Sequence, residues 1–329
     1  MTQTIFDLLR ILDEAGMNTF VSAETISEKL GITRTATWKY VNILRDSGYV
    51  IDALRTKGYA LKKRTLLLLP YEVKRHLSTK IIGQEMHHFD EVQSTNALAR
   101  RMMAEVGCEA QHGTVLIAEK QSGGAGRLNR VWISPVGGIW ATIVLKPKMN
   151  AENSFILMAS ASVALAKTIK HDFNLSALIG WPNDIYIGDK KVAGTTLELS
   201  ADDGNIRYCL LGIGVDANLN IAKVFPSMRD EVTSISDELG HEIERGKFFA
   251  HFLKEFERRY QMILKDETEA IFCEWKSLSN TLHRRVRIRT IHEGFDGEAL
   301  DIDEKGALLI HRDNGDVERV IAGDCTTLK

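Results

Sequence analysis

The amino-acid sequence changes its pattern twice, and these changes limit the folds that the chain can adopt. Residues 1–64 contain short amphipathic helical segments followed by two strand-like segments. From about Met86, apolar strand-like segments alternate with helical ones, and from Arg285 short strands follow one another with glycines between them. Three patterns within 329 residues predict three domains, each with its own core. We expect domains at residues 1–65, 66–282 and 283–329.

Composition excludes several classes of protein. The formal net charge is only -2, so the whole chain does not attract a polyanion. No window of 18 apolar residues occurs, and the first residues carry acids, which favours a cytoplasmic protein with no membrane span and no secretory signal. The four cysteines lie far apart, and CxxC and HExxH are absent. The sequence therefore indicates neither a disulfide framework nor a structural zinc site.

The first domain has the pattern of a winged helix-turn-helix. Ser22 can cap a helix that runs through Leu30, and Thr33 can cap a second helix that ends near Ser47. Two strands with a basic turn follow this second helix, as a wing would. Residues 29–64 contain nine basic and two acidic residues, an excess of seven positive charges. We expect this domain to bind DNA; the alternative is a small dimerisation module with a solvated basic face.

The second helix would enter the major groove of the DNA, where its leading end reaches base edges. The wing would contact phosphates, which position the protein without reading sequence. The residues expected at the DNA are Thr33, Arg34, Thr35, Trp38 and Lys39 on the helix, and Arg55 and Lys57 on the wing.

A glycine-rich loop with two arginines follows an apolar strand and reads QSGGAGRLNRVW over residues 121–132. Glycines let backbone N–H groups approach an anion, and Arg127 and Arg130 supply positive charge. The loop fits neither the phosphate-binding pattern GxxxxGK[ST] nor the dinucleotide fingerprint GxGxxG. Taken alone, it fits a flexible surface loop equally well, and GxSxG, the pattern of a nucleophilic serine, is also absent.

Residues 179–194 read IGWPNDIYIGDKKVAG and predict a β-hairpin. Gly188 and Asp189 stand between two short apolar segments, where a two-residue turn is expected. The polar corner of Trp181, Pro182, Asn183 and Asp184 in front of the hairpin is not needed for the turn. We interpret this corner as one wall of a binding pocket.

In this order, the motifs resemble those of bifunctional biotin protein ligases and biotin operon repressors of the BirA type. The motifs are the winged helix, Ser94-Thr95-Asn96, AEKQSGGAGRLNRVWISP, WPND, KKVAG, GIGVDAN and the C-terminal strands. The resemblance covers essentially the whole chain. It implies a multidomain α+β protein with an N-terminal winged helix-turn-helix, a central mixed α/β ligase domain and a C-terminal SH3-like β-barrel. It also implies that biotin and ATP form biotinyl-5′-adenylate, which a lysine of a biotin acceptor domain of a carboxylase then attacks, and that a ligand-linked homodimer binds operator DNA.

The resemblance also assigns roles to residues of this sequence. Ser94, Thr95 and Asn96 would contact the biotin ring, whose ureido group needs buried hydrogen-bond partners. Trp132 would stack near the adenine, and Arg127 and Lys191 would serve the chemical step. Asn183 and Asp184 would organise the phosphates or Mg²⁺. The other residues expected to line the substrates are Gln121, Gly124, Gly126, Gly194 and Gly214.

Three residues depart from the family pattern within the site. Gly180 stands where a lysine usually precedes WPND, Ala125 replaces an arginine of the loop, and Asp216 stands where asparagine is expected; Asn129 also replaces a usual glycine. Loss of one charge-stabilising donor typically costs about 2.7–4 kcal/mol of transition-state stabilisation. Asp216 would add a negative charge near the phosphates. These departures leave open an alternative function, a weak or inactive ligase that regulates transcription by sensing biotin, its adenylate or another small acid.

Overall fold

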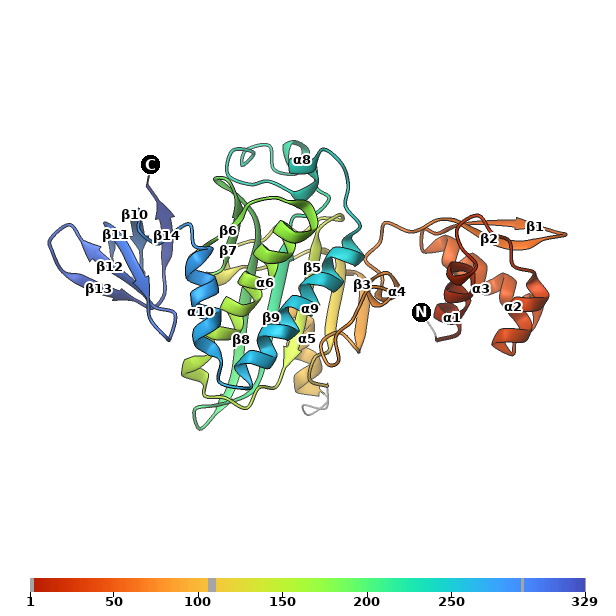
Figure 1. The fold of residues 1–329 in the computed structure, drawn as a ribbon, viewed down its shortest axis with the longest axis horizontal. Coiled ribbons are helices and arrows are strands. Elements are labelled where there is room, and N and C mark those ends of the chain that lie inside the picture. Colours follow the sequence, from red (N-terminus) through yellow and green to blue (C-terminus); the bar gives the residue numbers. More distant parts are fainter. Residues whose placement is uncertain (1–2, 106–110, 291–292, 329) are drawn as a thin grey trace. The chain divides into compact units, whose positions relative to one another are not determined.

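The computed structural model describes residues 3–105, 111–290 and 293–328. The chain forms two compact units, Met1–Leu67 and Leu68–Lys329 (Figure 1). The second unit contains a seven-stranded sheet with its helices and a separate five-stranded sheet. The expected boundaries of three domains, at 65/66 and 282/283, remain our proposal for how the chain divides.

The first unit is a three-helix domain with a two-stranded wing. Its elements are α1 (Gln3–Glu14), α2 (Ala23–Leu30), α3 (Arg34–Asp46), β1 (Val50–Leu54) and β2 (Gly58–Lys63). Ser22 and Thr33 cap α2 and α3 as expected, each accepting a hydrogen bond from a backbone N–H three residues on. Gly31 ends α2 in the left-handed conformation, with φ 64°, which allows the sharp turn into α3.

The core of this unit is apolar and lies between the three helices and the wing. Leu8, Leu12, Ile26, Val41 and Leu44 are fully buried. Helix α3 contributes Thr37, Val41 and Leu44 to this core. The opposite side of α3 remains available for a ligand.

The second unit is built on a mixed sheet in the order β3-β4-β5-β9-β8-β7-β6. Only β3 and β4 run parallel, and the other neighbours in this sheet pair antiparallel. The strands are β3 (Met86–Val92), β4 (Val115–Gln121), β5 (Ile139–Leu145), β6 (Ala177–Gly180), β7 (Asp184–Ile187), β8 (Lys190–Asp202) and β9 (Asn205–Val215). The hairpin predicted at Gly188-Asp189 joins β7 to β8.

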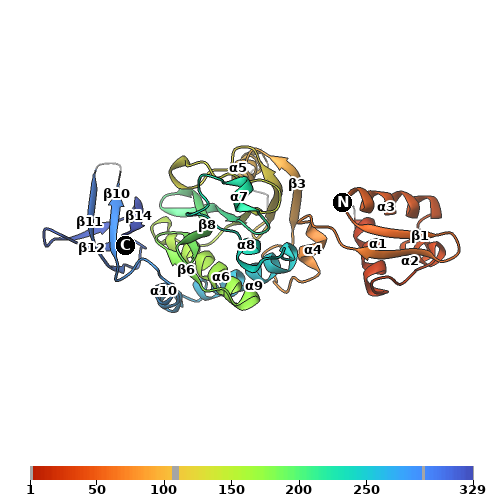
Figure 2. The same cartoon turned by 90° about the horizontal axis from the view of Figure 1, so that it is seen from above.

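Helices cover the two faces of this sheet unequally (Figures 1 and 2). On one face, α6 (Phe155–Phe173) and α9 (Arg245–Ile263) pack side by side, with α10 (Thr268–Ser277) against them. On the other face, α5 (Thr95–Glu105) contacts β4, β5 and β9. The short helices are α4 (Pro70–Lys74), α7 (Ile221–Val224) and α8 (Ile235–Leu239), with 3-10 turns at Arg127–Asn129 and Ala151–Asn153.

The main core lies between the sheet and the α6–α9 pair. Helix α6 is buried over most of its length because its alanines and serines let the sheet and two helices approach closely. Helix α9 contributes a row of rings, Phe249, Phe252, Phe256 and Tyr260, whose successive centroids lie 5.9–6.3 Å apart. All four rings are buried, so this face of the sheet serves mainly to stabilise the fold.

The C-terminal sheet is antiparallel in the order β13-β12-β11-β10-β14. Its strands are β10 (Arg285–Arg289), β11 (Gly294–Ile302), β12 (Leu308–Arg312), β13 (Val317–Val320) and β14 (Asp324–Thr327). The prediction of successive short strands after Arg285 is thus confirmed. In the described part of these strands no ladder joins β13 to β14, so the sheet is not closed into a barrel there. Of the helices described, none has the length and apolar character needed to cross a bilayer.

Candidate functional site

The candidate site lies on the α5 face of the seven-stranded sheet, above a floor that has almost no side chains. In the antiparallel ladders Gly194 pairs with Gly214, and Gly212 pairs with Thr142 and Thr196. Directly paired residues point to the same face of a sheet, so three glycines lie together among threonines. A floor without β-carbons lets large groups come close to the backbone.

Trp132 lies on this floor. A Cβ atom at Gly214 would lie 3.0 Å from its indole Nε1, and one at Gly194 would lie 3.2 Å from its ring carbon Cζ3. Its Nε1 is buried and has no hydrogen-bond partner among the residues that the structure describes. A buried donor without a partner costs about 1–3 kcal/mol, so a ligand that accepts this hydrogen bond would be favoured here.

Ser94, Thr95 and Gln121, predicted to contact a substrate, lie where α5 begins beside the end of β4. The backbone N–H of Thr95 donates to Gln121 Oε1 at 2.8 Å, and the Thr95 hydroxyl does so at 3.1 Å. The hydroxyl of Ser94 lies 3.4 Å from the backbone N of Ala97, as a weak cap of the helix. The structure thus brings Thr95 and Gln121 together, and their polar atoms fix one wall of the site.

Asn96 forms the end of the floor opposite Trp132. Its Oδ1 accepts from the Thr142 hydroxyl at 2.5 Å, and its Nδ2 donates to Glu198 Oε1 at 2.9 Å. A Cβ atom at Gly212 would lie 2.8 Å from Asn96 Oδ1. Asn96 is therefore held in place on β5, β8 and β9, and its orientation is set before any ligand arrives.

Charged groups gather beside Trp132. Lys191 Nζ lies 2.7 Å from Asp184 Oδ2 and 4.8 Å from the centre of the Trp132 ring. Arg127 Nη1 lies 3.5 Å from Asn183 Oδ1. Burial lowers the pKa of the Arg127 guanidinium, and the charge of Asp184 opposes that effect. Two cations thus point to one region, where an anionic ligand would be stabilised.

The glycine-rich loop is an irregular hairpin, with bridges between Gln121 and Ser134 and between Ala125 and Val131. Gly124 is fixed by packing, because a Cβ atom there would lie 2.4 Å from Trp132 O and 2.5 Å from Ser134 Oγ. The substrate-lining role of Gly124 stays a prediction, and the packing of the loop itself already requires a glycine here. Gly126 has more space, because the atom nearest to a Cβ added there would be Arg130 O, at 3.7 Å.

The place of the absent lysine at Gly180 is filled. Gly180 pairs with Asp184, so a side chain at position 180 would point to the face that carries Asp184. A Cβ atom there would lie 2.5 Å from Cε2 of the Tyr186 ring. A lysine at this position would displace the ring. Gly180→Lys would therefore change the packing of Tyr186 as well as add one positive charge.

The surroundings of Asp216 oppose the negative charge expected of it. Its side chain is 3% exposed, and its Oδ1 has no hydrogen-bond partner within the described part of the chain. Burial raises the pKa of the Asp216 carboxyl well above its usual range, and the charge of Lys191 offsets this effect only in part. Burial thus opposes the expected negative charge and favours the protonated carboxyl, which resembles the amide of asparagine.

The residues of the WPND corner face two different parts of the second unit. Trp181 points away from the site: its Nε1 donates to Gly306 O at 2.9 Å, and its backbone N–H donates to Thr281 Oγ1 at 3.0 Å. It therefore anchors the C-terminal sheet. Asn183 and Asp184, by contrast, face Arg127 and Lys191.

The fit of Mg²⁺ to Asn183 and Asp184 can be judged from the donor atoms. Carboxylate and amide oxygens suit this hard cation, which is commonly held by one or two carboxylates together with substrate phosphates. In the part of the chain that is described, Asp184 is not in a group of three or more His, Cys, Asp or Glu side chains able to share an ion. The residues thus fit a site that the phosphates of a nucleotide complete.

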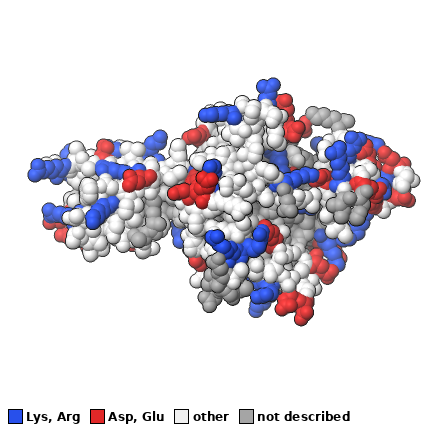
Figure 3. Space-filling view, turned by 180° about the vertical axis from the view of Figure 1, so that it is seen from behind, with Lys and Arg blue, Asp and Glu red and all other residues white. Residues whose placement is uncertain are grey.

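The predicted DNA-contacting residues lie on the surface of the first unit. Thr35, Trp38 and Lys39 are exposed on α3, and Arg55 and Lys57 are exposed at the tip of the wing. Among the charged side chains visible on this unit in Figure 3, more are basic than acidic. Two of the predicted residues have interaction partners within this unit. The Thr33 hydroxyl caps α3, and Arg34 lies 2.8 Å from Glu24 in an ion pair.

Sequence reasoning missed several residues of the site. Thr142 stands among apolar residues within a strand, and Thr196 and Glu198 lie beyond residues 179–194, where the hairpin was expected. Tyr186 lies in one of the two short apolar segments of the expected hairpin, where nothing in the sequence marks it as a site residue. The alternation of Gly212 and Gly214 was a usable signal, because residues two apart in a strand share one face.

Comparison with known proteins gives a consistent result along the chain. Residues 4–60 match the HTH domain model, residues 92–216 match the Biotin/lipoate A/B protein ligase family, and residues 281–326 match the Biotin protein ligase C terminal domain. The bifunctional ligase/repressor BirA of Bacillus subtilis is 34% identical over 319 residues, 97% of each chain. The Escherichia coli protein of the same name is 26% identical and covers 89% of each chain.

Solved structures show the same fold. The biotin protein ligase from Aquifex aeolicus in complex with biotin and ATP has a TM-score of 0.62 and 23% identity. It covers 74% of this chain and 98% of its own.

Proposed function

Because the chain belongs to the family of BirA-type bifunctional ligase/repressors, we propose that it joins biotin to a lysine of a biotin acceptor domain at the expense of ATP. The carboxylate of biotin attacks the α-phosphorus of ATP and releases pyrophosphate. The amine of the acceptor lysine then attacks the carbonyl carbon of biotinyl-5′-adenylate and releases AMP. The observation that carries this proposal is the convergence of Arg127 and Lys191 beside Trp132 on the glycine floor.

Each residue has a part that follows from its chemistry. Arg127 and Lys191 stabilise negative charge on the carboxylate and the α-phosphate, which is where charge grows in the first step. Lys191 can leave Asp184 for the phosphate, since both ends of that ion pair are partly exposed. Asp184 and the amide of Asn183 would hold Mg²⁺ together with the phosphates, and Mg²⁺ when bound neutralises part of their charge. Thr95, Asn96 and Gln121 offer fixed polar atoms to the ureido ring.

The test is biotinylation of an acceptor domain with ATP, Mg²⁺ and biotin. We expect the full chain to label the acceptor, Lys191→Met to lose about 10²–10³ in rate, and Lys190→Met, one residue earlier in β8, to stay close to the parent chain. Absence of product above background would contradict the ligase function.

A second function is favoured by one observation. The Tyr186 ring occupies the space where the family usually carries a lysine. A site with one cation fewer is suited to binding biotin or its adenylate without rapid turnover. Saturable biotin binding in calorimetry, together with no labelling of the acceptor, is the result expected of a regulator without ligase activity.

We also propose that the chain is a biotin-responsive repressor that binds operator DNA as a ligand-linked homodimer. The basic wing and the exposed side of α3 support DNA binding. The operator can be selected from random duplexes in the presence of biotin and ATP. Trp38→Ala should weaken binding to the selected sequence more than binding to other duplexes. Lys57→Ala should weaken all duplexes alike and lower the slope of log affinity against log salt by about 1, while Lys148→Ala in the second unit should change neither.

A further inference from the structure

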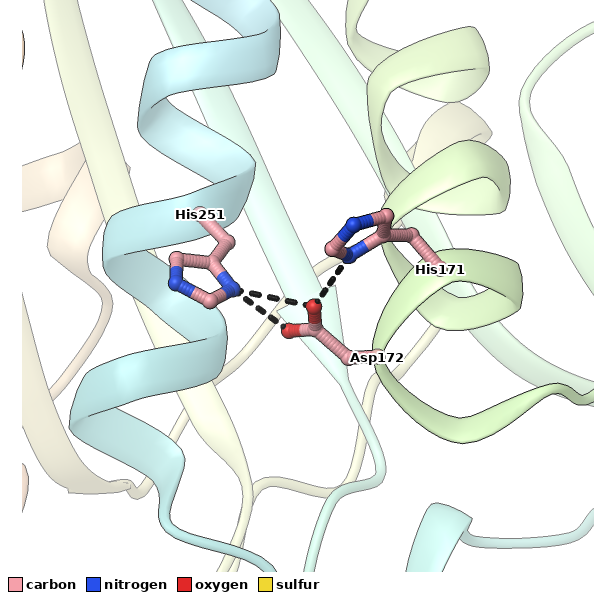
Figure 4. Close-up of side chains that lie close together, drawn as sticks. All are labelled: His171, Asp172 and His251. Atoms are coloured by element: carbon pink, nitrogen blue, oxygen red, sulfur yellow. Dashed lines mark hydrogen bonds and ion pairs between the residues drawn. The ribbon is translucent and has the colours of Figure 1, made fainter.

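A compact group of two histidines and one aspartate lies on the helical side of the second unit. His171 and Asp172 are in the last turn of α6, and His251 is in the second turn of α9 (Figure 4). The candidate ligand site occupies the opposite face of the sheet, so this group has no part in it. Within the described residues, it is the one group of three or more His, Cys, Asp or Glu whose ligand atoms all lie within 4.8 Å of one another.

Asp172 stands between the two imidazoles. His251 Nδ1 lies 2.9 Å from both carboxylate oxygens, and His171 Nδ1 lies 2.8 Å from Oδ1. A carboxylate only accepts hydrogen bonds, so in this arrangement both Nδ1 atoms carry protons. Without those protons, the same two nitrogens and the same carboxylate are a donor set for a transition-metal ion.

The neighbouring packing fixes the position of these groups. The rings of Phe173 and Phe248, next to the group on α6 and α9, stack with centroids 5.6 Å apart. The Asp172 side chain is only 9% exposed and that of His251 is 32% exposed, whereas the His171 side chain is 83% exposed. Two ligands are therefore held by the fold, and the third can turn freely to complete a coordination shell.

The distances require only a small adjustment. Zinc bonds of about 2.0–2.2 Å in a tetrahedron separate neighbouring ligand atoms by roughly 3.3–3.5 Å. The present nitrogen–oxygen distances are 2.8–2.9 Å, so each imidazole nitrogen has to move away from the carboxylate by about half an ångström. The exposed His171 ring and the partly exposed His251 ring can both make this movement. The open side toward solvent leaves room for water as a further ligand.

We propose that His171, Asp172 and His251 bind one Zn²⁺ ion, which joins the end of α6 to α9. Imidazole nitrogens favour zinc, nickel and copper, whereas Mg²⁺ and Ca²⁺ favour sites made only of oxygen. The site therefore discriminates against the Mg²⁺ that the ligase reaction uses. A metal bond between two helices that cover the core stabilises the second unit, because only the folded chain brings residues 172 and 251 together.

Titration calorimetry of the metal-free full chain with ZnCl₂ tests the site. We expect one tight equivalent of Zn²⁺, no comparable heat with MgCl₂, and a higher Tm in the presence of Zn²⁺. His171→Ala, a change on the surface that leaves the packing intact, and His251→Ala should each weaken this binding at least about tenfold. His241→Ala, in the loop before α9, is the matched control and should bind like the parent chain.

Co²⁺ identifies the donor atoms. We expect ligand-field bands of a nitrogen and oxygen site that are lost in Asp172→Asn, with no thiolate charge-transfer band. A thiolate band would assign the ion to a cysteine and overturn the proposal. Equal Zn²⁺ affinity of the parent chain, His171→Ala and His251→Ala, or no Zn²⁺ binding by the parent chain, would overturn it as well.

Discussion

The two faces of the seven-stranded sheet are made of different residues for different purposes. Toward α6 and α9, β5 and β9 present Ile139, Ile143, Leu211 and Ile213, which are buried in the main core. Toward α5, the same two strands and β8 present glycines and threonines together with polar and charged side chains. The first face has mainly large apolar groups, with the buried Glu119–Arg245 ion pair among them, and the second has a glycine floor under Trp132 with polar groups around it.

Stability and ligand binding therefore depend on opposite faces of the same strands. Successive residues of a strand point to opposite faces, so one strand can contribute to both without compromise. Substitutions on the α6–α9 face should act on the free energy of unfolding. Substitutions on the α5 face should act on ligand affinity and turnover. The following predictions test this separation, beginning with the largest effect.

Phe252→Ala should lower the free energy of unfolding by about 3–5 kcal/mol, because a fully buried ring between Phe249 and Phe256 leaves a cavity. Urea unfolding followed by near-ultraviolet circular dichroism measures this loss. Biotin affinity of the protein that remains folded should not change. A large loss of affinity in the folded fraction would break the separation of the two faces.

Arg127→Ala should reduce kcat/KM for acceptor biotinylation by about 10²–10³, with a Tm close to that of the parent chain. Arg127 stabilises charge in the reaction, whereas its described interactions within the fold are weak, a 3.5 Å contact with Asn183 and the charges of Asp184 and Asp324. Steady-state kinetics and thermal melting measured on the same sample check both parts. A drop in Tm with unchanged kinetics would assign Arg127 to the fold instead.

Gly214→Ala should weaken ligand binding more than it destabilises the fold. The added methyl group would lie 3.0–3.2 Å from three atoms of the Trp132 indole, which has to shift. Overpacking of this kind typically costs about 1–3 kcal/mol, and here the half-buried indole can move to relieve part of it. Calorimetry with biotin and with ATP compares the affinities, and Gly188→Ala, in the hairpin turn, serves as a control for loss of a glycine away from the floor.

Asp216→Asn should remove a pH dependence of stability. Folding raises the pKa of the Asp216 carboxyl. The contribution of this group to the free energy of unfolding is therefore fully present below its unfolded-state pKa, and it is lost as pH rises through its folded-state pKa. Across that window the parent chain should lose stability relative to Asp216→Asn at about 1.4 kcal/mol per pH unit. Parallel urea unfolding of the two proteins from pH 4 upward measures the difference. Identical pH profiles would show that Asp216 is ionised in the folded chain.

Much of the secondary structure followed from local signals. Ser22, Thr33 and Gly31 mark helix ends by their own hydrogen bonds and backbone preferences, so the helix-turn-helix was predictable from neighbours in sequence. The strand β6 was missed because, unlike the equally short β7, it does not adjoin the turn signal at Gly188-Asp189. The extent of β8 was missed because its second half owes its pairing to β9 and not to a strong apolar alternation.

The candidate site was predictable as a set of motifs but not as an arrangement. The sequence indicated Arg127, Lys191, Asn183 and Asp184, and the structure places these four near one another. No feature of the sequence indicated that the Trp181 side chain points to the C-terminal sheet. The grouping of residues 171, 172 and 251 also went unseen, since metal patterns are recognised by short spacings and this one spans two helices.

The sequence by itself determined where helices begin and end, where the hairpin turns, which domain is basic, and which family the motifs resemble. These properties depend on residues a few positions apart. The tertiary structure alone decided that Tyr186 fills the space beside Gly180, that Trp132 lies on the glycine floor, and that Asp216 is buried, which raises its pKa. Contacts and desolvation between distant segments set these properties, and they exist only once the chain has folded.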